Sequence, residues 1–126
     1  MNLEINGVDY ELNFGLRFCR EISKDKKQSS HGIDLRIGIE NAVTNLYVGD
    51  VLILPDLVKA ATSHLKKKPT DKDIEDFLDN YDDLGGLCDD FLSQLLEQSA
   101  TKKKATEVYN SLKKEAEKEK KAEAEA

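Results

Sequence analysis

The sequence feature that most constrains the fold is the alternation of apolar and polar residues over positions 3–12, folded about Asn6-Gly7. Asn and Gly tolerate the positive φ angles of a type I′ turn, so this stretch predicts a tight two-stranded β-hairpin. The apolar cross-strand pairs are then Ile5 with Val8 and Leu3 with Tyr10. Because a two-stranded hairpin is marginally stable alone, its apolar face must lie on the helices that follow.

Composition fits one small, mainly helical domain. The 126 residues include 6% aromatic residues, 35% charged residues and no Trp, unlike a typical sandwich or barrel. Residues 1–100 carry eleven Lys/Arg against nineteen Asp/Glu, and residues 101–126 carry eight Lys against six Glu, which together give a net charge of −6. An acidic body argues against nucleic-acid binding, because phosphates need a positive surface. No apolar run approaches the roughly 18 residues of a membrane span, so we expect no membrane association and a cytoplasmic protein.

Helical spacing of apolar residues predicts about five helices after the hairpin. Their expected ranges are 14–24, 34–48, 50–65, 70–81 and 84–98. Asn13 is the expected N-cap of the first helix, and Thr70 with Asp73 has the spacing of a capping box at the fourth. The polar segment 23–32 is expected to be a loop. We therefore predict a mainly α fold, a small helical bundle with an N-terminal hairpin, as one domain over residues 1–100.

From Thr101 the composition changes to Lys, Glu and Ala, with only Val108, Tyr109 and Leu112 to bury. Such a segment can form a solvated helix but has few side chains to dock with. Ordering a residue costs roughly 1–2 kcal/mol of backbone entropy. We therefore expect residues 101–126 to be a charged tail, flexible or helical, that the body does not need for folding.

The run Val51-Leu52-Ile53-Leu54 has more apolar side chains than one helix face can bury. Successive helical residues point about 100° apart, so a helical run would leave some of these side chains at the surface for a partner. Proline is comfortable only in the first turn, so either the helix begins at Pro55 or Asp50 caps it and it kinks at the proline. The alternative is an extended, fully buried stretch before Pro55.

The sequence has no catalytic or metal-binding motif. The acidic segment 71–83 lacks the glycine that an EF-hand loop needs at its sixth position, where this chain has Asp76. The two histidines and two cysteines lack a short chelating pair. Cys19 and Cys88 lie on predicted apolar faces, where burial raises a thiol pKa. We therefore expect no enzyme activity, no catalytic residues, no cofactor and no metal.

Five stretches carry a resemblance to a known family, in the order LEINGVDYELNFGLRFCREI, GIDL, GDVLILPDLVKAA, KKPTDKDIEDFLD and LCDDFLSQLLEQS. Together they resemble the tail assembly chaperones of long-tailed phages of Gram-positive bacteria, over roughly residues 1–100. The resemblance implies a non-enzymatic protein, absent from the finished virion, that binds the tape-measure protein and keeps it soluble while tail-tube subunits polymerise around it. It also implies, in many such phages, a longer frameshifted form whose extension would begin near the Lys-rich tail.

The apolar run and the resemblance together predict the partner-binding residues. They are Val51, Leu52 and Leu54, with help from Leu95 and Leu96. An apolar surface left empty before the partner arrives also favours self-association, so a homo-oligomer is expected too, as is contact with the tail-tube protein. Two alternatives stay open: a small dimerising adaptor or regulator that uses the same helices, and a hydrolase with a Cys nucleophile.

Overall fold

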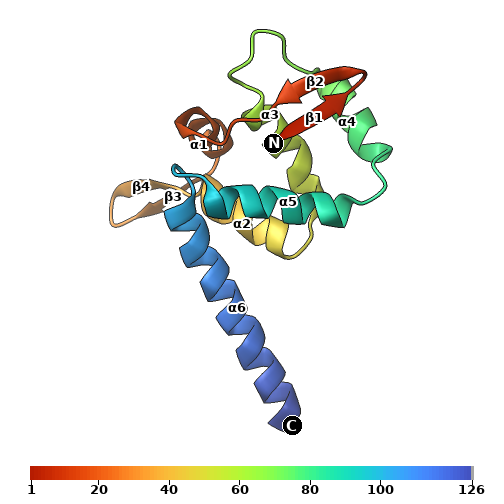
Figure 1. Cartoon of the computed structure of the whole chain (residues 1–126). Coiled ribbons are helices and arrows are strands. Elements are labelled where there is room, and N and C mark those ends of the chain that lie inside the picture. The colour runs from red at the N-terminus through yellow and green to blue at the C-terminus, as the bar shows by residue number, and fades with distance from the viewer. Residues whose placement is uncertain (126) are drawn as a thin grey trace.

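The computed structural model describes the backbone of residues 1–125 and their side chains except those of residues 30, 33, 34 and 123–125. The fold is mainly α and has two antiparallel β-hairpins (Figure 1). The first hairpin precedes all the helices, and the second lies between the first and second helices. The elements are β1 (Asn2–Ile5), β2 (Val8–Glu11), α1 (Leu16–Ser23), β3 (Lys27–Ser30), β4 (Ile33–Arg36), α2 (Gly38–Tyr47), the 3-10 turn η1 (Val51–Ile53), α3 (Leu54–Ala61), α4 (Asp71–Asp79), α5 (Leu84–Glu97) and α6 (Lys102–Glu125).

The N-terminal hairpin has the predicted turn and register. Asn6 and Gly7 have φ angles of 52° and 76°, and Ile5 pairs with Val8 as Leu3 pairs with Tyr10. The inner side chains are buried against the helices, whereas Val8 stays partly exposed. The backbone N–H of Asn13 donates to the carbonyl of Ala61 at 2.9 Å, which ties the end of the hairpin to α3.

The first helix begins later than predicted. Its N-cap is Gly15 rather than Asn13, and α1 starts at Leu16. The Asn13 side chain instead accepts a hydrogen bond at 2.9 Å from the backbone N–H of Gly15, which turns the chain into the helix.

The prediction of a loop over 23–32 and of a helix from residue 34 is wrong. A second hairpin, β3–β4, occupies these residues, and its turn at His31-Gly32 has φ angles of 52° and 76°, like the first. Because residues 33–36 are paired in β4, α2 cannot begin before Gly38. Gly38 packs closely on the end of α1: an added Cβ would lie 2.8 Å from the carbonyl oxygen of Ile22.

The segment around Pro55 combines the two helical alternatives and excludes the extended one. The Asp50 side chain accepts a hydrogen bond at 3.1 Å from the N–H of Leu52 and caps η1. The α-helix α3 then begins at Leu54, with Pro55 in its first turn, where a missing N–H costs nothing. This change of helix type turns Ile53 and Leu54 into the core.

The last helices of the body follow their sequence signals. Thr70 and Asp73 form the predicted capping box of α4, and α5 ends at Glu97, one residue before the expected end. Buried α5 side chains meet the hairpin and α1 in the core, where the ring of Phe14 lies edge-on to Phe18 at 5.0 Å and to Phe91 at 5.8 Å. Such aromatic pairs add to the stabilisation from burial.

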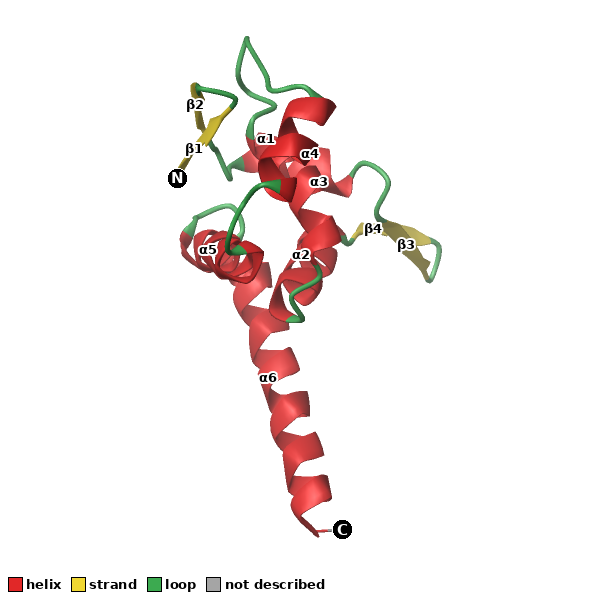
Figure 2. Ribbon diagram, turned by 90° about the vertical axis from the view of Figure 1, so that its right-hand side faces the viewer, coloured by secondary structure: helices red, strands yellow, loops and turns green. Residues whose placement is uncertain are grey.

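The tail forms one long helix, α6, which both views show leaving the body (Figures 1 and 2). Packing does not stop at residue 100, because Ala105 is fully buried and Val108, Tyr109 and Leu112 pack against the core. The Thr101 hydroxyl donates to the carbonyl of Leu95 at 2.7 Å and fixes the turn between α5 and α6. The first turns of α6 are therefore part of the packed body, which corrects the expectation of a solvated tail from Thr101 onward.

Candidate protein-binding surface

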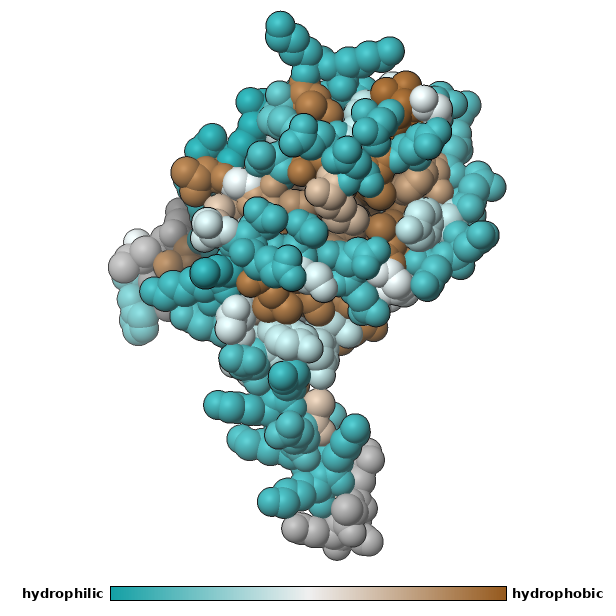
Figure 3. All heavy atoms as spheres, in the orientation of Figure 1, coloured by the Kyte–Doolittle hydropathy of each residue, from teal (hydrophilic) through white to brown (hydrophobic). Residues whose placement is uncertain are grey.

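Three apolar side chains form an exposed surface where α2 ends and η1 begins. Val48 is 66% exposed, Val51 37% and Leu52 79%. We call these three residues the α2–η1 patch. Apolar surface is visible on this side of the molecule, below α5 where α2 ends (Figure 3). Exposed apolar patches of this kind are candidates for protein-binding surfaces.

The backbone holds the patch in place. Gly49, with a φ of 74°, ends α2 in the left-handed conformation that glycine favours. The N–H of Asp50 donates to the carbonyl of Asn45 at 2.9 Å, and its side chain caps η1. The patch is thus presented on two capped helix ends rather than on a free loop, which lowers the entropy lost on binding.

The structure brings only part of the predicted site to the surface. Val51 and Leu52 are exposed, whereas Leu54 and Leu95 are completely buried and Leu96 is half-buried against the core. The expectation that Leu54 and Leu95 offer surface to a partner is therefore corrected. Leu54 faces inward because α3 starts there, and Leu95 lies on the inner stripe of α5.

Sequence reasoning missed Val48. The inner face of α2 consists of Ala42, Val43 and Leu46, and a helical spacing from these residues does not reach Val48. Gly49 marked the end of the helix. The signal that could have identified Val48 is its position: it is a large apolar residue at the end of the helix, and it does not lie on the buried face.

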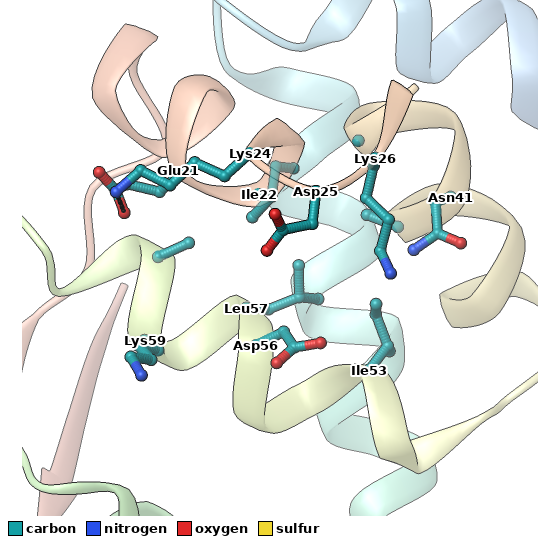
Figure 4. A pocket seen from close by; sticks show the side chains of 13 residues that line it. Glu21, Ile22, Lys24, Asp25, Lys26, Asn41, Ile53, Asp56, Leu57 and Lys59 are labelled. Atoms are coloured by element: carbon teal, nitrogen blue, oxygen red, sulfur yellow. Dashed lines mark ion pairs between the residues drawn. The ribbon is translucent and has the colours of Figure 1, made fainter. Parts of the chain in front are cut away.

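Apart from this patch, a concave surface lies between α1, the 24–26 segment, α2 and α3, and its cavity has a volume of about 360 Å3 (Figure 4). Its floor is apolar, and the carboxylates of Asp25 and Asp56 point into it from opposite walls. On its rim, Lys24 pairs with Glu21 at 2.9 Å, and this hydrogen bond lowers the pKa of Glu21. The residues Asp25 and Asp56 are exposed to water, so their carboxylates do not form a desolvated acid–base pair.

The surroundings of the two cysteines do not activate their thiols. Burial raises the pKa of both thiols, and the carboxylate of Asp89 raises that of Cys88 further. A raised pKa lowers the thiolate fraction, which is the reactive form. Within the described residues, no three His, Cys, Asp or Glu side chains gather as metal ligands. The described helices include none that is both long and apolar enough to cross a membrane.

Comparison with known proteins identifies the class. A family model described as "Phage tail assembly chaperone protein, TAC" matches residues 2–110. This match covers both hairpins, the helical body and α6 as far as residue 110, so the chain belongs to the phage tail assembly chaperone family. Chaperones of this kind are generally not enzymes. No curated protein and no solved structure gives a significant match.

Proposed function

We propose that this chaperone binds the tape-measure protein of its phage through the α2–η1 patch and keeps that protein soluble during tail-tube assembly. Family membership supports a role in tail assembly, and the exposed patch is the observation that favours this surface. Its action is in the host cytoplasm, before the finished virion exists. The tail-tube protein is a second proposed partner within the same assembly.

The chemistry of the patch suits an apolar helix. Fully burying an exposed Val or Leu side chain contributes roughly 1.5–3 kcal/mol, so covering Val48 and Leu52 would supply most of the gain and the partly covered Val51 less. A partner helix presents apolar side chains at every third or fourth position, a spacing that a short, rigid apolar surface can accept. A long apolar protein such as the proposed tape-measure partner would contain many such helical segments.

Co-expression tests this proposal. The tape-measure protein alone is expected to aggregate, and to become soluble and co-purify when the chaperone is present. Leu52→Asp should abolish rescue, because a carboxylate in an apolar contact is costly to desolvate. Leu16→Asp is the matched control, since Leu16 is 69% exposed on α1, outside the patch.

Circular dichroism should show that both variants stay folded, because neither leucine is buried. If Leu52→Asp still rescues, or Leu16→Asp alone fails, the binding surface lies elsewhere. If the unaltered chain never rescues the tape-measure protein, the proposal is wrong and a dimerising adaptor becomes the better interpretation.

A further inference from the structure

One face of α6 remains open beside α2. Together with Glu40 of α2, it lines a groove of about 300 Å3. The apolar side chains at its floor, Val108 and Leu112, are only half-buried by their own body. After Leu112 no apolar side chain of the described part of α6 packs against the core, yet the helix continues to Glu125 (Figure 2).

The charge of the residues along this face changes from positive to negative along the helix. Lys104, Val108, Ser111 and Glu115 recur at the i, i+4, i+7, i+11 spacing that places side chains in one line on a helix. The line begins with a cation and ends with an anion. Its midpoint falls between Val108 and Ser111.

We propose that two copies of this chain pair through this face, with their α6 helices antiparallel. A twofold axis at the midpoint places Lys104 of each copy opposite Glu115 of the other, and Val108 opposite Ser111. A parallel pair would instead place Lys104 on Lys104 and Glu115 on Glu115. Charge order therefore favours one orientation, as charged flanking positions do in coiled coils.

The charges that this pairing needs are available. Glu115 makes no ion pair among the described residues, and Lys104 pairs only with Glu107 of its own helix, at 3.4 Å. That pair is half-exposed on both sides, and exposed pairs of this kind contribute little. In this register the residues just after Leu112, 113–117, also lie along the first turn of the second α6. Because apolar contact is limited to Val108 and Leu112, the dimer should be weak and sensitive to salt.

Sedimentation equilibrium of the full chain, up to millimolar concentration, tests this pairing. The unaltered protein is expected to form a dimer that weakens as salt is added. Lys104→Glu and Glu115→Lys should each lower the association constant by about tenfold or more, because each single change creates two like-charge contacts. The double variant K104E/E115K restores opposite charges and should restore the dimer.

Circular dichroism checks that α6 stays helical in each variant. A protein that is monomeric at every concentration would overturn the pairing, as would a dimer that neither single change weakens or a double variant that stays monomeric. The α2–η1 patch shares no residue with this groove, so Leu52→Asp should leave the dimer intact. Loss of pairing and loss of tape-measure rescue can therefore be told apart.

Discussion

The two β-hairpins share a turn and differ in what covers them. Both turns have φ angles of 52° and 76°, at Asn6-Gly7 and at His31-Gly32. In β1–β2 the inner side chains are buried, and Ile5 is 1% exposed. In β3–β4, Leu35 is 48% exposed and neighbouring described side chains are in water. Turn chemistry thus fixes the shape of a hairpin, whereas burial determines whether the rest of the protein depends on it.

The largest expected effect separates the two hairpins directly. Ile5→Ala should lower the free energy of unfolding by about 2–5 kcal/mol, because it leaves a cavity in the core. Leu35→Ala should change it by less than about 0.5 kcal/mol, as for most exposed sites. Urea denaturation of both variants measures the difference. Equal losses would mean that β3–β4 is covered in solution, as β1–β2 is.

The same criterion of burial divides α6 into two halves. Truncation after Ala100 should destabilise the body by about 2 kcal/mol, since it removes the packed side chains Ala105, Val108, Tyr109 and Leu112 and uncovers the ring of Tyr47. Truncation after Leu112 removes only the projecting half and should shift Tm by no more than about 2 °C. Thermal melts of the two truncated chains check this. Equal Tm values would show that the first turns of α6 are not docked.

Substitution of Gly38, which follows the second hairpin, should destabilise the protein more than substitution within the strands of that hairpin. Gly38→Ala places a methyl group against the Ile22 carbonyl and the Ser23 hydroxyl, and overpacking of this kind costs about 1–3 kcal/mol. Denaturant midpoints of this variant and of Leu35→Ala give the contrast. A neutral Gly38→Ala would mean that α1 and α2 can separate without loss of stability.

The smallest expected effect lies on the outer face of the first hairpin. Glu4 and Asp9 are directly opposite, so two like charges face each other across the strands. Asp9→Lys should raise stability by about 0.3 kcal/mol, the scale of a cross-strand charge pair. Asp9→Asn is the control, because it removes the charge and keeps an oxygen that can accept the 3.2 Å hydrogen bond from Asn2. A clear loss in Asp9→Lys would mean that this face is occupied.

The first hairpin could be predicted from sequence and the second could not, for a physical reason. β1–β2 combines a strong turn with alternating apolar residues, because one of its faces is buried. The strand β3 reads Lys-Gln-Ser-Ser, which has no apolar residue, and its described side chains 27–29 are exposed, so there is no apolar–polar alternation to detect. The helical body was predictable where apolar periodicity and caps agreed, as at Thr70 and Asp73.

The candidate surface was predictable only in part. An excess of apolar residues at 51–54 indicated that some must face outward, but which ones depends on where the helix changes type. That point is set by the Asp50 cap and by Pro55 in the first turn of α3, and it buries Leu54 while exposing Leu52. The docking of α6 depends on its tertiary contact with α2, including the edge-on rings of Tyr47 and Tyr109 at 5.8 Å. A contact between residues so far apart in the chain cannot be predicted from a local sequence pattern.

Hydrogen exchange on the complex tests most directly whether the tape-measure protein covers the α2–η1 patch, as proposed. Binding should slow the exchange of backbone amides over residues 48–53, because covering Val48, Val51 and Leu52 excludes water and stabilises the capped turn. The amides of α1, beside the exposed Leu16, should exchange at the same rate with and without partner. Slowing confined to α1, or to any segment other than 48–53, would contradict the claim.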